Sequence, residues 1–271
     1  MTSDPTLQEL RGYRWRRFTP WQRLGRYLAY LATVAVLVWS VRDLDIFWPW
    51  VWDAPEQVAD LLRRMYPPEW RRVGEIVRVL LETVKIATLA TLLALVFAVP
   101  AAYISARNTS PHPVLVWVGR FVLVASRSVN TIIWALLFVA IFGPGAVAGV
   151  AAIAVRSIGF IGKLISEAIE EIDPAQVEAI QATGAGRGKV LLYGIVPQVL
   201  PAFFAVTVLR WDINIRESTV LGLVGAGGIG LLLQGSIDLF AWTTVSAILI
   251  AILVLVVLAE FVSAWLRSKV L

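Results

Sequence analysis

Long apolar runs alternate with short polar segments along the chain, and most runs have the length of a membrane-crossing helix. They cover residues 27–41, 76–105, 114–142, 146–169, 191–211 and 241–265. We expect the fifth run to be broken by Pro197 and Pro201 and to end near Trp211. A helix needs about 20 apolar residues to cross a hydrocarbon core of roughly 30 Å. Inside a bilayer every backbone polar group must pair within the protein, so such runs are helical. The pattern predicts an all-α integral membrane protein with about six transmembrane helices.

The composition agrees with a membrane protein and excludes several chemistries. Of the 271 residues, 58% are hydrophobic and 16% are charged, and the mean hydropathy is +0.75. A soluble domain is about 45–50% apolar and about 25% charged. A membrane β-barrel would show alternating segments of about ten residues, and this sequence has none. Because cysteine is absent, a disulfide framework, a thiolate nucleophile and a cysteine metal site are excluded.

Both ends of the chain carry positive charge, which predicts their side of the membrane. The basic residues before the first apolar run are Arg11, Arg14, Arg16, Arg17, Arg23 and Arg26. By the positive-inside rule this tail stays in the cytoplasm, and Arg267 and Lys269 place the other end there too. No cleavage site follows the first run, so we expect a retained, multi-pass protein of a bacterial inner membrane. The net charge of +5 then reflects topology, and no nucleic-acid partner is expected.

Residues 42–75 form the most water-facing segment. Three tryptophans are typical of an aromatic belt at the outer membrane interface: Trp48, Trp50 and Trp52. Apolar residues then follow at helical spacing: Val58, Leu61, Leu62 and Met65. This pattern predicts an amphipathic helix along the membrane surface. We therefore divide the chain into a first part, residues 1–75, and a core transmembrane domain, residues 76–271.

A short polar island, residues 173–190, interrupts the apolar sequence. Asp173 can cap a helix that Pro174 opens, because proline lacks only an N–H that has no partner in the first turn. Three glycines then end the helix and turn the chain: Gly184, Gly186 and Gly188. Arg187 and Lys189 favour the cytoplasmic side. A preformed polar helix between membrane spans predicts a docking site for a soluble protein, and the alternative is an ordinary cytoplasmic connection.

Residues 210–230 combine four charges with five glycines in RWDINIRESTVLGLVGAGGIG. Irregular backbone at membrane depth is tolerated only where it is buried in protein or lines a wet cavity. Three of the glycines fit a dinucleotide-binding spacing, but no strand or βαβ unit is predicted around them. After Lys189 the chain has Val190 in place of the serine or threonine that a P-loop uses for magnesium. We expect no cofactor in this chain, with ATP and magnesium bound by a partner.

Arginines inside the apolar runs are candidates for an anion pathway. A central arginine costs about 2.5–3.5 kcal/mol on insertion, so it normally faces a partner or a water path. Guanidinium groups bind phosphonate oxygens in a bidentate manner. The candidate pathway residues are Arg127, Ser128, Asn130, Arg156, Ser157, Arg216, Glu217 and Ser218. Structural alternatives are that Arg216 pairs with Glu217 or Asp212 across helices, and that Arg127 reaches the membrane interface.

Two motifs resemble known transporter sequences. Four residues follow the order of the EAA loop of ABC importer permeases: Glu178, Ala179, Gly184 and Pro197. The departures from that pattern are Ile180, Gly194 and Val196. The run RESTVLGLVGAGGIG, with EEID before the island and YGIVPQVLP after it, resembles the permeases of phosphonate-type ABC importers. This second resemblance covers roughly residues 76–265.

The resemblance implies the fold of type I importer permeases, in which the island forms a cytoplasmic coupling helix. The residues that would couple the ATPase are Asp173, Pro174, Glu178, Ala179, Gly184, Arg187, Lys189 and Pro197. It also implies a homodimer, two cytoplasmic ABC ATPase subunits and a periplasmic or lipid-anchored substrate-binding protein. The chain would be a non-catalytic permease subunit that imports phosphonate or a related phosphorus oxyanion, such as phosphite or a phosphate ester.

Other functions stay open at this point. Within ABC importers, methionine and osmolytes are alternative substrates, because specificity lies largely in the binding protein. A secondary transporter would show inverted repeats and ion-linked carboxylates, whereas this sequence has no convincing repeat and only Glu260 deep in its last run. A membrane enzyme would need a nucleophile–base set or metal ligands, and the sequence offers neither.

Overall fold

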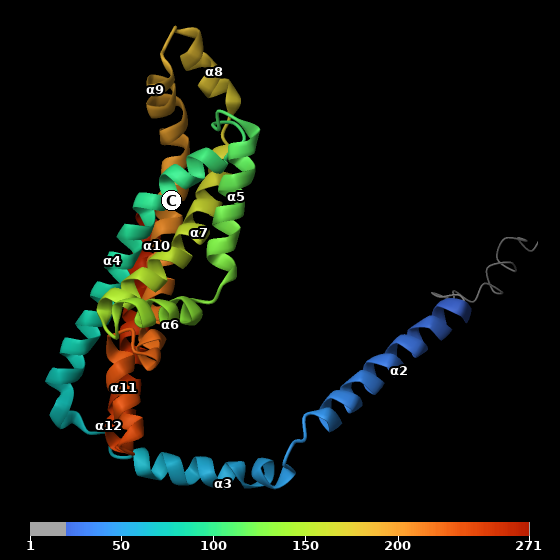
Figure 1. Ribbon diagram of the computed structural model, residues 1–271, viewed down its shortest axis with the longest axis vertical. Coiled ribbons are helices and arrows are strands. Elements are labelled where there is room, and N and C mark those ends of the chain that lie inside the picture. The colour runs from blue at the N-terminus through green and yellow to red at the C-terminus, as the bar shows by residue number, and fades with distance from the viewer. Residues whose placement is uncertain (1–19, 271) are drawn as a thin grey trace, which may run out of the picture. The chain divides into compact units, whose positions relative to one another are not determined.

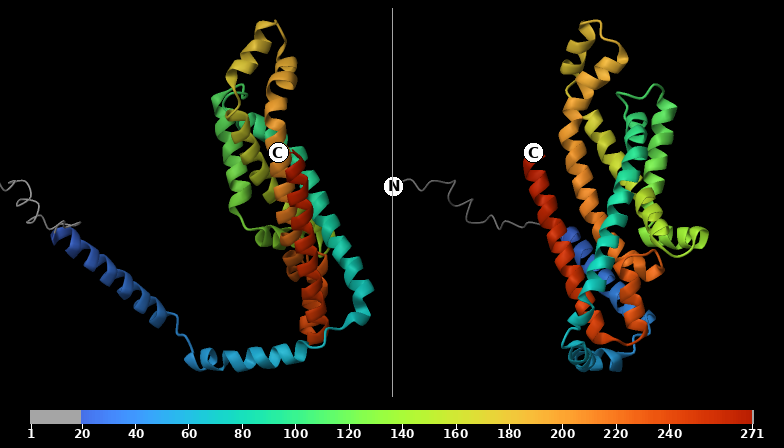
Figure 2. Two further views of the ribbon diagram at one scale, coloured as in Figure 1. Left: turned by 180° about the vertical axis from the view of Figure 1, so that it is seen from behind. Right: turned by 90° about the vertical axis from the view of Figure 1, so that its left-hand side faces the viewer.

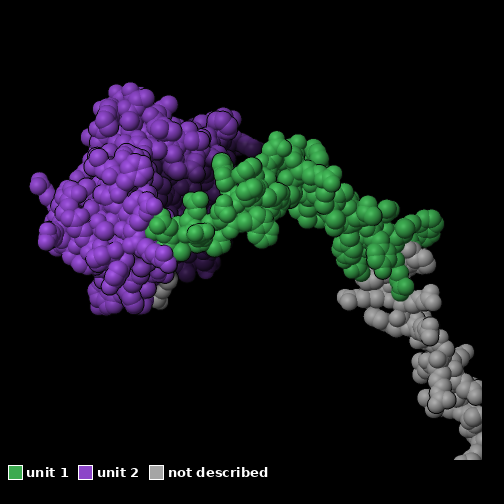
Figure 3. Space-filling model, turned by 90° about the horizontal axis from the view of Figure 1, so that it is seen from below, with its two compact units in different colours: residues 1–60 green, residues 61–271 purple. Residues whose placement is uncertain are grey.

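The computed structural model describes residues 20–270, and every regular element among them is a helix (Figure 1). The chain forms two compact units, residues 1–60 and residues 61–271 (Figure 3). Four arginines of the predicted cytoplasmic tail lie outside the described residues: Arg11, Arg14, Arg16 and Arg17. The predicted all-α membrane fold is confirmed.

The first unit contains α2 (Pro20–Asp43) and most of α3 (Trp48–Met65). α2 is long and apolar enough to cross a membrane, and its side chains are exposed from Trp21 onward. The predicted amphipathic helix is present in α3, where no residue is buried. Its tryptophans begin the helix instead of preceding it, and all three are exposed.

The second unit is a bundle in which α4, α7, α10 and α12 run alongside one another (Figures 1 and 2). Its elements are a 3-10 turn (Trp70–Arg72), α4 (Val73–Ser105), α5 (Pro113–Ser128), α6 (Thr131–Phe142), α7 (Ala146–Glu170), α8 (Pro174–Ala182), α9 (Arg187–Val190), a π-helical turn (Leu191–Ile195), α10 (Val196–Leu221), a 3-10 turn (Gly222–Val224), α11 (Ile229–Asp238) and α12 (Trp242–Val270). α8 and α9 lie at one end of this unit and α11 lies at the other.

The predicted third span, residues 114–142, is not one straight helix. α5 and α6 meet at an angle of 88°. The bend has a local cause, because the Asn130 side chain accepts a hydrogen bond from the Ile132 N–H at 3.0 Å and starts a new helix. The described part of the chain thus holds five helices fit to cross a membrane, or six if the bent pair counts as one span.

The predicted fifth span was expected to break at Pro197 and Pro201 and to end near Trp211, and this prediction is wrong. α10 begins at Val196 and continues to Leu221, through Pro201 and the whole charged segment. Pro197 lies in the first turn, where a missing N–H costs nothing. The helix continues past Trp211 because the charges that follow find partners, as described below.

Small residues hold the bundle together. Alanines that are fully buried form a stripe along α4: Ala87, Ala90, Ala94, Ala98 and Ala102. On α7, a Cβ atom added at Gly159 would lie 2.4 Å from the carbonyl oxygen of Leu123 in α5. Lipid tails are as apolar as leucine, so close backbone approach rather than hydrophobicity favours helix association in a bilayer. This packing sets which faces of α5, α7 and α10 meet.

The glycine run at the end of α10 forms a tight reversal. Gly225, Gly227 and Gly228 have φ values of +84°, +80° and +71°, which favour glycine. A Cβ atom at Gly222 would lie 2.5 Å from the Cα of Gly230, so the backbone at the end of α10 touches the backbone at the start of α11. The backbone therefore approaches itself closely at these glycines.

Candidate functional site

A cluster of charged side chains is centred on Glu217 of α10. Arg156 Nη1 donates to Glu217 Oε1 at 2.6 Å, and Arg210 Nη2 lies 3.3 Å from both carboxylate oxygens. Thr131 at the start of α6 donates to Glu217 Oε2 at 2.7 Å and accepts from Arg156 at 2.7 Å. The Arg210 side chain is 3% exposed, Glu217 17% and Arg156 31%. Two cations thus share one carboxylate, which leaves the cluster with surplus positive charge.

A chain of hydrogen bonds extends this cluster into the core. Arg210 Nε donates to Ser157 Oγ at 2.9 Å, and Ser157 donates to Asn214 Oδ1 at 3.1 Å. Asn214 Nδ2 donates to Thr91 Oγ1 on α4 at 2.8 Å. The Arg210 guanidinium also lies over the ring of Phe160, 5.2 Å from its centre. The network joins α4, α7 and α10, so the orientation of Arg210 is determined by three helices.

Two of the predicted pathway arginines line one cavity. It has a volume of about 300 Å³ and is lined by Arg127, Ser128, Arg156 and Phe160. Arg127 and Ser128 end α5, whereas Arg156 and Phe160 lie on α7. Among the described residues Arg127 makes no ion pair, and its side chain is exposed. A small, partly open cavity with one unpaired and one shared guanidinium has the chemistry to contact an oxyanion.

Three other pathway candidates, Arg216, Ser218 and Asn130, do not line this cavity. Arg216 pairs with Asp212 along the same helix, so one of the structural alternatives holds, although not across helices. Ser218 is buried and donates to the backbone carbonyl of Thr83 on α4 at 3.0 Å, which is a packing contact. Asn130 caps α6. A transport role for these residues stays a prediction.

The polar island has the helix boundaries that its residues predict. Asp173 Oδ1 accepts from the Ala175 N–H at 2.9 Å, and Pro174 is the first residue of α8. The helix ends at Ala182, and Gly184 follows with a φ of +78°. The other four proposed coupling residues have exposed side chains, as does Pro197 at the start of α10: Glu178, Ala179, Arg187 and Lys189. α8 therefore presents a polar surface to solvent.

Gln198 and Gly194, at the base of the island, were not among the predicted site residues. Gln198 is hydrogen-bonded to the backbone at both ends of the island. A Cβ atom at Gly194 would lie 3.4 Å from Ile180 Cδ1 and 3.6 Å from the Val177 Cα, so α8 packs directly on the π-helical turn. This contact explains the glycine at 194, where the EAA pattern has isoleucine. No local sequence signal marked Gln198, because its partner at the start of the island, Asp173, is 25 residues away along the chain.

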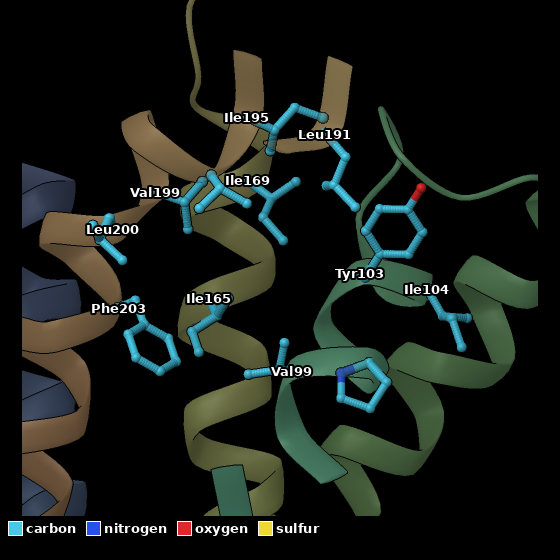
Figure 4. A pocket seen from close by; sticks show the side chains of 12 residues that line it. Val99, Tyr103, Ile104, Ile165, Ile169, Leu191, Ile195, Val199, Leu200 and Phe203 are labelled. Carbon is cyan, nitrogen blue, oxygen red and sulfur yellow. The ribbon is translucent and has the colours of Figure 1, made fainter. Parts of the chain in front are cut away.

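A second cavity of about 530 Å³ lies between α4, α7 and the start of α10 (Figure 4). Its lining includes Tyr103, Ile165, Leu191 and Phe203, and no charged side chain contributes to it. It is therefore unsuited to an oxyanion. Within residues 20–270, no three His, Asp or Glu side chains come together as metal ligands would.

Comparison with known proteins identifies the family. Residues 98–271 match the family described as the binding-protein-dependent transport system inner membrane component. The chain belongs to this family. It is therefore an inner membrane component of such a transport system, and curated relatives confirm its resemblance to phosphonate-type ABC importer permeases.

Two curated relatives show how far the similarity extends. The phosphite transport system permease PtxC of Stutzerimonas stutzeri is 40% identical over 92% of this chain and 90% of its own length. The phosphate-import permease PhnE of Mycolicibacterium smegmatis is 38% identical over 87% of this chain and 43% of its own length. By contrast, the methionine import permease MetP of Bacillus subtilis is 27% identical over 33% of this chain.

The solved structures agree on the fold. The inward-facing MetNI methionine ABC transporter matches with a TM-score of 0.64 and 22% identity, over 75% of this chain and 99% of that one. An amino acid ABC transporter matches with a TM-score of 0.60 and 18% identity. At these identities the likeness concerns the fold, which is that of a type I importer permease.

Proposed function

We propose that this chain is the transmembrane subunit of an ATP-driven importer that carries phosphonate, phosphite or a phosphate ester across the bacterial inner membrane. The observation that carries the proposal is the 40% identity to a phosphite transport permease over 92% of the chain. The methionine permeases align over only about a third of it, which disfavours methionine as the substrate.

The proposed assembly contains two copies of this chain, two cytoplasmic ABC ATPases and a periplasmic or lipid-anchored substrate-binding protein. The ATPases bind ATP and magnesium, and this chain is a non-catalytic subunit. Both termini lie in the cytoplasm in this arrangement, on the same side as α8. The basic residues Arg267 and Lys269 at the end of α12 support that orientation.

The cavity beside Arg127 and Arg156 is the proposed contact for the translocated anion. Arg127 supplies an uncompensated positive charge, and Ser128 lines the cavity beside it, with its hydroxyl donating to the Val124 carbonyl at 2.6 Å. Glu217 competes with the anion for Arg156, because it already occupies one side of that guanidinium. Such competition keeps binding weak, and a transport pathway must release what it binds.

α8 is the proposed coupling helix. Its exposed residues, Glu178 among them, dock on an ATPase, and closure of the ATPases on ATP moves α8 and the helices attached to it. Alternating access then follows from exchange of the inner and outer openings, and no covalent chemistry occurs in this chain.

The test is uptake by liposomes that contain the permease and its ATPase, with the binding protein added outside and ATP enclosed. We expect uptake of labelled phosphite or a phosphonate that stops when a non-hydrolysable ATP analogue replaces ATP. Uptake of methionine without uptake of any phosphorus oxyanion would overturn the substrate class. Concentrative uptake by the permease alone would instead establish a secondary transporter.

A further inference from the structure

The two ends of the polar island are joined by one side chain. Gln198 Oε1 accepts a hydrogen bond from the Asp173 N–H at 2.9 Å, and Gln198 Nε2 donates to the Gly194 carbonyl at 2.7 Å. Asp173 is the residue that caps α8 as the chain leaves α7, and Gly194 lies in the π-helical turn by which the chain returns. The amide therefore bridges the start and the end of the loop that carries α8.

Apolar packing strengthens the same junction. Val177 and Ile180 on the inner face of α8 lie against Gly194, where an added Cβ atom would be in van der Waals contact with both residues. The π-helical turn is wider than an α-helical turn, and such turns occur frequently at functional sites. α8 thus contacts α10 through a polar clamp and a glycine contact, and its remaining surface is free for a partner.

α10 connects this junction to the charged cluster. It is one helix from Val196 to Leu221, and it carries Gln198 in its first turn and both Arg210 and Glu217 farther along. Pro201 cannot donate a backbone hydrogen bond to the Pro197 carbonyl, but the helix is continuous through it, so displacement of its first turn is passed along the helix. Movement of α8 therefore reaches the charged cluster around Glu217 through α10 only if α8 and the start of α10 move together.

We propose that Gln198 is the positioning residue that makes α8 and α10 one mechanical unit, so that ATPase movement is transmitted to the anion cavity. This inference rests on the proposed role of α8 as the coupling helix. Gln198 is thereby part of the coupling apparatus, although it contacts neither the ATPase nor the anion. Its function depends on both ends of the side-chain amide, one as acceptor and one as donor.

The test uses the whole transporter and measures oxyanion uptake per ATP hydrolysed. In Gln198→Leu both hydrogen bonds are lost at nearly the same side-chain size, and we expect ATPase subunits to remain bound while uptake per ATP falls about fivefold or more, within the usual range of coupling between sites. Gln198→Glu keeps the acceptor for the Asp173 N–H and loses the donor, so it should fall between wild type and Gln198→Leu. The matched control is Gln234→Leu, which removes an exposed amide that bonds Asp238 on α11. It should behave as wild type.

An engineered disulfide distinguishes a mechanical role of Gln198 from a general loss of folding in the variant. The chain has no cysteine, so Val177→Cys with Gly194→Cys in the Gln198→Leu background creates one possible disulfide within each copy of the chain. The Gly194 Cβ position is 3.6 Å from the Val177 Cα, which is close enough for that bond. We expect the oxidised form to recover uptake per ATP, or assembly if Gln198→Leu had lost it, and the reduced form not to recover.

Two results would overturn the inference: unchanged uptake per ATP in Gln198→Leu, or no recovery after complete oxidation of the cysteine pair. Failure of the proposed function looks different, because wild-type transporter would then show no ATP-dependent oxyanion uptake. The wild type and the variants are measured in the same preparation, so the two failures are distinguishable.

Discussion

The island around α8 and the cluster around Glu217 both concentrate polar residues in an apolar chain, but they are stabilised in opposite ways. In α8 the cap, the first proline and the terminal glycine lie within a dozen positions of one another, and the charged side chains point to solvent. In the cluster, side chains from α6, α7 and α10 must meet before any charge is satisfied. Exposed charges tolerate substitution, whereas buried charges depend on every partner.

The largest expected effect is therefore in the cluster. Glu217→Ala removes the carboxylate shared by Arg156 and Arg210, and leaves Arg210, which is 3% exposed, without a counter-charge. Breaking a buried pair in this way costs about 3–5 kcal/mol. The thermal unfolding temperature of this variant in detergent should be clearly lower than that of wild type. Asp238→Asn, at an exposed site on α11, is the control. An equal fall in unfolding temperature in both variants would show that the buried charge contributes no more to stability than the exposed one.

Arg127→Gln should separate transport from stability. Arg127 is exposed and makes no ion pair among the described residues, so the unfolding temperature should not change. Oxyanion uptake should fall about tenfold to hundredfold if one charge-assisted hydrogen bond to the anion is lost. Arg71→Gln, on the exposed 3-10 turn before α4, is the matched control. Normal uptake in Arg127→Gln would remove the cavity from the pathway.

Glu178→Arg tests the exposed face of α8. The substitution lies on the solvent side of the helix, so insertion and unfolding temperature should be those of wild type. Reversal of charge in the docking face should reduce co-purified ATPase by about tenfold, as one interface residue commonly does. Asp238→Arg makes the same change at the opposite end of the unit and should leave ATPase binding intact. Full ATPase recovery with Glu178→Arg would argue against docking at α8.

The smallest expected effect is loss of the cap. Asp173→Ala removes the hydrogen bond to the Ala175 N–H and should destabilise α8 by about 1 kcal/mol. Amide hydrogen exchange should accelerate in residues 174–182 and nowhere else. Asp173→Asn retains an acceptor at the cap and should exchange as wild type does. Faster exchange across the whole bundle would show that the stability of α8 is linked to that of the bundle and does not depend on its own cap alone.

Much of the fold could be predicted because its signals are local. The apolar runs, the cap at Asp173 and the glycine after α8 each act within a few residues. The errors arose where local signals competed. Asn130 starts a helix inside an apolar run and bends the predicted third span, while Pro201 does not end α10.

The candidate site was only partly predictable for the same reason. Arg127 and Arg156 were selected as membrane arginines, but nothing in their spacing indicated that they line one cavity. Arg210 was counted among the charges and not selected, although it is the most buried of the arginines in the cluster. Gln198 carried no signal, since its acceptor and donor partners are backbone groups.

By itself the sequence determined the membrane class, the limits of α7 and α8 and the family, because hydrophobic length, capping and motif order are properties of neighbouring residues. Only the tertiary structure decided which charges share a partner. Arg156 of α7 meets Glu217 of α10, which also pairs with Arg210, because contacts across helices depend on how each helix is rotated about its axis. That rotation is set by close packing at residues such as Gly159 and Ala98, which is a property of the assembled bundle.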